Sequence, residues 1–115
     1  LPDRTQTLHL TAGSGYTHGI DGASFPDAPL IPVSEGERLR LRIVNDTMMF
    51  HPIHVHGHTF EMVSEGSARK DTVNVLPMSA VEFDMQADNP GQWMFLCHNT
   101  YHLDTGMATV LSYRS

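Results

Sequence analysis

The chain has 115 residues, which suits one domain and is too short for two of ordinary size. Hydrophobic residues make up 40% and charged residues 17%, as in a globular domain that buries one core. The formal net charge of −6 argues against a nucleic-acid partner, because such partners select a basic face. No apolar run approaches the roughly 18 residues of a membrane-spanning helix, so no membrane role is expected.

No signal peptide is recognisable at the start of the chain, which begins with Leu1 instead of Met. A mature product, a fragment, or a trimmed or engineered domain is therefore expected.

Short strands separated by turns are predicted along the chain. Apolar and polar residues alternate most clearly in 38–44 and 80–86, as in half-buried strands. About eight strands at this spacing predict an all-β sandwich or barrel. Only 99–106 lacks strand character, and one turn of helix fits its residues. The other predicted strands, which Gly, Pro, Asn and Asp separate, are 7–11, 30–33, 54–63, 72–76, 91–98 and 107–113.

Four of the eight histidines lie within one octet, HPIHVHGH, which begins at His51. Alternate residues of a strand share a face, so His54, His56 and His58 are expected to point the same way. His51 precedes a proline that is expected to break the alternation and let this imidazole face elsewhere. The octet therefore predicts two separate directions for metal ligands.

A second group, Cys97, His102 and Met107, has four residues between each consecutive pair. Cys97 is the only cysteine, so it is a nucleophile, a metal ligand or a buried bystander. Two imidazoles, a thiolate and a weak axial thioether are typical of blue copper electron-transfer sites, whereas zinc prefers four strong ligands. A cysteine hydrolase needs an accessible thiol and oxyanion donors, and does not need the methionine. With His51, this group predicts a type 1 copper site.

The segments HPIHVHGHTF and NPGQWMFLCHNTYHLDTGM closely resemble the C-terminal cupredoxin domain of bacterial, laccase-like multicopper oxidases, and the resemblance covers about residues 7–113. It implies one Greek-key cupredoxin domain over 1–115, copper as the cofactor, and a periplasmic or secreted location. It also implies that His51, Cys97 and His102 are equatorial ligands of a type 1 copper and that Met107 is the axial ligand.

The same resemblance gives roles to the remaining histidines. The position of His54 binds the type 2 copper of a trinuclear cluster in the family, and those of His56 and His98 bind the type 3 pair. His58 matches a position that is not a ligand. In this chain, His54, His56 and His98 are either ligands of a second copper or zinc ion or exposed histidines without metal.

The chain departs from the family at Leu96, where the family motif His-Cys-His has its first histidine. Leu96 is expected to lie on the strand face opposite Cys97, to share that face with His98, and to pack as an apolar residue. The family builds its trinuclear cluster from two cupredoxin domains. One domain with a leucine at this position is therefore not expected to reduce dioxygen alone.

Three functions follow from this sequence. The leading one is one-electron transfer through a single type 1 copper. The second is an oxidoreductase subunit or fragment, either laccase-like or a nitrite-reductase-like assembly whose second copper site another chain completes. The third is copper binding or storage. The expected partners are a redox protein or small redox molecule, and further copies of the chain or other cupredoxin domains.

Overall fold

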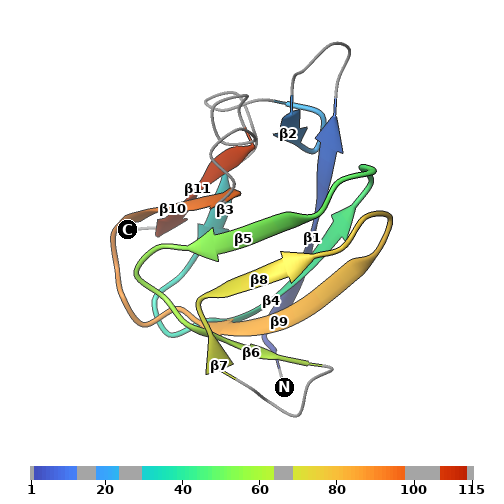
Figure 1. Ribbon diagram of the computed structural model, residues 1–115. Helices are drawn as coiled ribbons and strands as arrows, with labels where there is room; N and C mark the ends of the chain where they lie inside the picture. Colours follow the sequence, from blue (N-terminus) through green and yellow to red (C-terminus); the bar gives the residue numbers. More distant parts are fainter. Residues whose placement is uncertain (1, 13–17, 24–29, 64–68, 98–106, 114–115) are drawn as a thin grey trace.

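The computed structural model describes residues 2–12, 18–23, 30–63, 69–97 and 107–113, which form eleven strands in two sheets (Figure 1). No helix occurs in these ranges, and so none of them holds a helix that could cross a membrane. The all-β prediction is confirmed. The first sheet contains β1 (Arg4–Ala12), β2 (His18–Ile20), β4 (Arg38–Asn45), β6 (Phe60–Met62), β7 (Arg69–Lys70) and β9 (Ala80–Gln86). The second contains β3 (Ile31–Val33), β5 (His51–Val55), β8 (Thr72–Val75), β10 (Gln92–Cys97) and β11 (Ala108–Tyr113).

Both sheets are mixed. The order of strands in the first is β2-β1-β4-β9-β6-β7, and in the second it is β3-β11-β10-β5-β8. The pairs β1–β4 and β3–β11 are parallel, and the other pairs are antiparallel. In the second sheet, β10 lies between β11 and β5, so the segments with the candidate ligands are neighbours although they are far apart in sequence.

The core lies between the two sheets and follows the alternation seen in the sequence. Leu39, Leu41 and Ile43 of β4 are fully buried, and the arginines between them are not. The rings of Phe60 and Phe83 stack with their centroids 3.9 Å apart. One cluster of buried apolar side chains includes residues of both sheets, so the core fixes each sheet relative to the other.

The prediction of a single strand over 54–63 is wrong. The segment contains the end of β5, in the second sheet, and β6, in the first. The chain changes sheets at Gly57, which has a φ of +74°. A Cβ atom at this position would lie 2.7 Å from the ring of Trp93. The turn therefore requires glycine both for its backbone conformation and for its space.

The other predicted strands agree with the structure within a few residues, and 80–86 coincides with β9. The three-residue β2 and the two-residue β7 were not predicted, because strands this short show no alternation. The segment 99–106, with its predicted turn of helix, lies outside the described residues.

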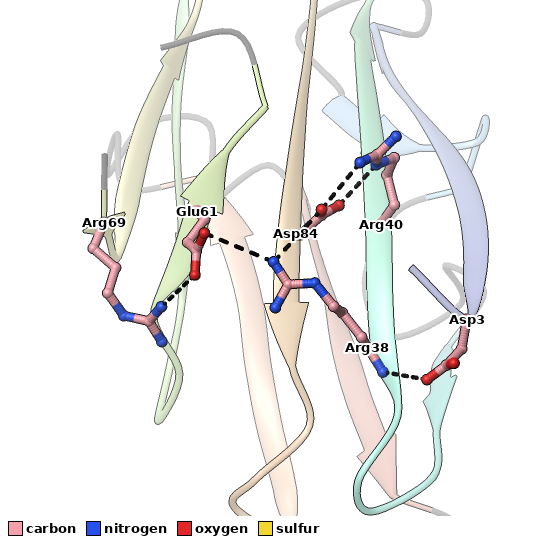
Figure 2. Close-up of polar contacts among 6 residues, drawn as sticks. All are labelled: Asp3, Arg38, Arg40, Glu61, Arg69 and Asp84. Atoms are coloured by element: carbon pink, nitrogen blue, oxygen red, sulfur yellow. Dashed lines mark hydrogen bonds and ion pairs between the residues drawn. The ribbon is translucent and has the colours of Figure 1, made fainter. Parts of the chain in front are cut away.

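A ladder of ion pairs crosses the outer face of the first sheet (Figure 2). Asp84 accepts two hydrogen bonds from Arg40, at 2.8 and 3.0 Å. The Arg40 guanidinium holds the pKa of the Asp84 carboxyl below its usual value, although partial burial acts in the opposite direction. The ladder joins Arg69 of β7, Glu61 of β6, Arg38 of β4, Asp84 of β9 and Arg40 of β4, in that order of contact.

We expect Asp84→Asn to lower the Tm at pH 7, because the variant loses the charge that accepts both Arg40 hydrogen bonds. A carboxyl whose pKa is lower in the folded state stabilises the fold above its unfolded pKa of about 3.9, and this contribution is lost as the pH falls through the folded pKa. Thermal unfolding should therefore show a difference between variant and parent at pH 7 that shrinks below about pH 4. Glu82→Gln, an equal charge loss on β9, is the control. An Asp84→Asn effect independent of pH contradicts the assignment.

Candidate metal centre

His51 is the first residue of β5, and its side chain is fully buried. The burial of β5 alternates regularly, with His51, Ile53 and Val55 facing the core. The expectation that Pro52 breaks the alternation is therefore wrong. His51 and His54 face opposite ways because they are three residues apart on one regular strand. The predicted separation of two ligand directions is found, but for a different reason.

Cys97 lies next to His51, and Met107 lies next to Cys97. The Cys97 thiol is fully buried, and its Sγ is 3.6 Å from Nδ1 of His51. The backbone N–H of Cys97 donates to the carbonyl of Met107 at 3.0 Å, and Met107 is fully buried too. The pairing of β10 with β5 places Ile53 opposite Cys97. Three of the four residues predicted for the type 1 site are therefore fully buried, and His51 and Met107 each contact Cys97.

The donor atoms present fit a copper ion. At the distances typical of zinc sites, about 2.3 Å to sulfur and about 2.0 Å to nitrogen, one ion could bind both atoms across their separation of 3.6 Å. His51 and Cys97 would then supply two ligands of the same ion. A thiolate, an imidazole and a thioether form a soft donor set that suits copper.

The fourth predicted ligand, His102, lies outside the described residues, as does His98. Within the described ranges, no group of three or more His, Cys, Asp or Glu side chains is arranged to hold a metal ion. His51 and Cys97 are only two such residues, and the Met107 thioether is of another type. A complete type 1 site thus depends on His102.

Asn45 and Thr47 form a buried, hydrogen-bonded polar cluster beside His51, which the sequence analysis did not predict. Nε2 of His51 is 2.8 Å from the Thr47 hydroxyl, which is 2.7 Å from Oδ1 of Asn45. The Asn45 side-chain amide donates to the carbonyls of Met49, Val75 and Leu76 at 2.7 to 3.1 Å. Asn45 lies on the buried face of β4, where the alternation predicts an apolar residue. A polar residue at this position could have indicated the cluster from the sequence.

His54 and His56 lie close together, as predicted, with ring centroids 4.9 Å apart. Nδ1 of His54 is 2.8 Å from the carbonyl of Asp71 and 3.1 Å from the Thr72 hydroxyl. Because a carbonyl only accepts hydrogen bonds, Nδ1 carries the proton, and a metal would bind His54 through Nε2.

His58 does not continue the strand face of these two histidines, because it lies beyond the end of β5. Strand β5 ends at Val55, and His58 is buried after the turn at Gly57. Its Nδ1 donates to the carbonyl of His56 at 3.0 Å, and its Nε2 accepts from Tyr113 at 2.7 Å. Burial raises the pKa of the Tyr113 hydroxyl, which keeps this donor protonated. Both ring nitrogens of His58 therefore form hydrogen bonds within the chain, in keeping with a non-ligand position in the resemblance.

Leu96 lies opposite His54 in the pairing of β10 with β5, so the two side chains share the outer face of the second sheet. Leu96 is only 6% exposed, which agrees with the expected apolar packing. An open cleft of about 430 Å³ adjoins this face and is lined by His54, His58, Asp71 and Asp88 among others. An imidazole at position 96 would have faced the same side as His54, so leucine removes a donor from that side.

Two neighbouring loops near His51 expose large apolar side chains. Met48 is 80% exposed, and Met49 and Phe50 beside it are about half exposed. Met78 has a φ of +53°, which is uncommon for a residue with a side chain, and its backbone N–H donates to the carbonyl of Thr47. The exposed side chains are Met48, Met49 and Phe50 of the first loop and Leu76 and Met78 of the second, and we call them the methionine surface.

Comparison with known proteins identifies the family. The model of the multicopper oxidase family matches residues 1–115. The chain belongs to the multicopper oxidase family. It is 46% identical over 118 residues to the multicopper oxidase MmcO of Mycobacterium tuberculosis, a match that covers 97% of this chain and 23% of that protein. It is 39% identical over 110 residues to copper resistance protein A of Escherichia coli, covering 92% of this chain and 18% of that protein.

Solved multicopper oxidases share the fold. The blue copper oxidase of Nitrosomonas europaea has a TM-score of 0.87 and 26% identity, over 95% of this chain and 43% of that one. A metallo-oxidase of Campylobacter jejuni superposes with a TM-score of 0.89 over all of this chain and 31% of that one, at 22% identity. The cupredoxin fold and the resemblance to multicopper oxidases are confirmed. The chain spans less than a quarter of the length of the curated relatives named above.

Proposed function

We propose that this multicopper oxidase domain binds one type 1 copper through His51, Cys97, His102 and Met107, and that it transfers single electrons. The observation that carries the proposal is the 3.6 Å contact between the only thiol of the chain and the buried imidazole of His51. The burial of Met107 beside Cys97 supports it, because a thioether is the axial ligand typical of blue copper sites.

Copper in this donor set supplies a one-electron couple between its +1 and +2 states. The contribution of the chain is a ligand frame buried on two paired strands. His51 and Cys97 lie on adjacent strands of one sheet, both are fully buried, and the sheet holds them at a separation that suits one ion. Ligands fixed in this way move little when the charge of the ion changes, which lowers the cost of reorganisation.

Two histidine variants test the ligand assignment. We expect His51→Ala to abolish the intense thiolate-to-copper band of the copper-loaded chain, because an equatorial nitrogen is lost. His54→Ala is the matched control and should leave the band unchanged, because His54 lies on the outer face of the same strand. Visible and paramagnetic-resonance spectra make the comparison. Loss of the band in His54→Ala, or its retention in His51→Ala, contradicts the assignment.

A second candidate is an oxidase subunit or fragment, laccase-like or completed by a second copper site between chains. The paired rings of His54 and His56 favour it, because they provide two imidazoles close together, and His54 lines an open cleft. Leu96 opposes a complete cluster, because it occupies the same face without a donor atom. Additional coupled copper per chain, with oxygen consumption in the presence of a phenolic donor, would favour the oxidase.

The third candidate, copper storage, requires that the ion stay in one oxidation state. A colourless copper(I) or zinc form that cannot be oxidised reversibly would favour it over electron transfer. We place the domain in the periplasm or outside the cell on the strength of its resemblance to copper-resistance and oxidase proteins. We propose a redox protein or a small redox molecule as its partner, and the methionine surface beside His51 supports an approach at that loop.

A further inference from the structure

We infer that Thr47 is a positioning residue that fixes the His51 imidazole with Nδ1 directed at Cys97. The inference rests on the proposed function, because it assigns His51 to the copper site. It concerns the hydrogen bond on the far side of the ring, where Nε2 of His51 lies 2.8 Å from the Thr47 hydroxyl. This oxygen is buried, so the direction of its one hydrogen determines which ring nitrogen carries a proton.

The orientation of the Asn45 amide is the first step. Its Nδ2 lies within 3.1 Å of three backbone carbonyl oxygens, which accept hydrogen bonds and cannot donate them. Its Oδ1 accepts the backbone N–H of Thr47 at 2.9 Å. The opposite orientation would bring oxygen against three carbonyls and NH₂ against an N–H. Asn45 therefore presents an acceptor oxygen to the Thr47 hydroxyl.

The direction of the Thr47 hydroxyl follows. Oδ1 of Asn45 and the carbonyl of Met49 lie 2.7 and 3.0 Å from it, and both are acceptors only. If the hydroxyl donated to His51 instead, both acceptors would face an oxygen lone pair at hydrogen-bond distance. The hydroxyl therefore donates toward Asn45 and Met49, and it accepts the hydrogen on Nε2 of His51.

The proton on Nε2 leaves Nδ1 as the acceptor and metal-binding nitrogen. This agrees with the contact on the other side of the ring, where the thiol of Cys97 lies 3.6 Å from Nδ1 and can donate to it. The ring is thus held between a hydroxyl and a thiol before any metal binds. Because Asn45 also joins the 46–50 loop to the end of β8, the hydroxyl is itself anchored to two elements.

Nuclear magnetic resonance of the metal-free 115-residue chain tests the tautomer without any variant. Long-range proton–nitrogen correlations of the His51 ring should show the hydrogen on Nε2, with slow solvent exchange because Thr47 is buried. A hydrogen found on Nδ1 overturns the inference, whatever the variants do.

Variants test the positioning role. Thr47→Val keeps the shape of the side chain but removes the acceptor, and second-shell losses of this kind lower metal affinity about 10- to 100-fold. We expect a loss of this size for copper(II), with an altered charge-transfer band and reduction potential. Thr47→Ser should restore all three properties, because it keeps the hydroxyl. If Thr47 had only a structural role, Thr47→Val would lower the Tm but leave the charge-transfer band unchanged, and Thr47→Ser would have no spectroscopic property to restore.

Thr72→Val is the matched control, because it removes a threonine hydroxyl 3.1 Å from the outer-face imidazole of His54. Its copper affinity and spectrum should equal those of the parent. A Thr47→Val variant that binds copper as the parent does, with the same spectrum, overturns the inference alone. A parent chain that shows no thiolate-to-copper band overturns the proposed function instead, so the two failures are distinguishable.

Discussion

Replacing Cys97 with serine should abolish the thiolate-to-copper band completely while the metal-free chain keeps its fold. Cys97 is the only thiol in the sequence, so no other residue can supply the charge-transfer donor. Serine is smaller and keeps a hydrogen-bonding group near His51, so the core should lose at most about 3 kcal/mol. The measurement is a visible spectrum of the copper-loaded variant beside circular dichroism of the metal-free form.

Met107→Leu is the control for general damage at the site. It alters the weak axial ligand and keeps the thiolate, so a strong band should persist while the reduction potential changes. Retention of the parental band in Cys97→Ser would exclude this thiol as the ligand. If metal-free Cys97→Ser loses its fold, the prediction that the fold survives is wrong, and Cys97 is then also required for the structure of the core.

Phe83→Ala should cause the largest loss of stability. Phe83 is fully buried on β9 and stacks on Phe60 of the neighbouring strand, with ring centroids 3.9 Å apart. Truncating a buried phenylalanine leaves a cavity and costs about 3–5 kcal/mol. Since domains of this size are stable by about 5–15 kcal/mol, the Tm should fall by about 10 °C or more.

Thermal unfolding of the metal-free chain measures this loss without the contribution of bound metal. Phe50→Ala is the matched control, because Phe50 is largely exposed in the loop before β5. Its free energy of unfolding should change by about 0.5 kcal/mol or less. Equal effects of the two substitutions would mean that the Phe60–Phe83 stack does not form the centre of the core.

The alternation of apolar residues was sufficient to predict the long strands. In β4 and β9, one face is buried and the other polar, so the period of two is visible in the sequence. The sheet change at Gly57 was missed because the residues on both sides favour strands, and a single glycine within a strand pattern can mark a bulge as well as a turn. The pairing of β1 with β4 and the stacking of Phe60 on Phe83 depend on contacts between distant segments.

The candidate ligands were predictable from residue type, because few ions suit a thiolate with imidazoles and a thioether. Their mutual placement was predictable only in part. Sequence reasoning separated His51 from His54 by assuming a break at Pro52, whereas regular alternation along β5 separates them. The role of Thr47 depends on the position of its hydroxyl between Asn45 and His51. It could not be predicted from the sequence, because it requires the relative positions of these three side chains.

The most direct test of the account is the visible and paramagnetic-resonance spectrum of the copper-loaded 115-residue chain, measured together with its copper content. We predict one copper per chain, an intense thiolate-to-copper band, and the narrow copper hyperfine splitting of a type 1 site. A copper-loaded chain that lacks this band, or whose copper resembles an ordinary nitrogen–oxygen site, would contradict the claim that Cys97 and His51 bind the same ion.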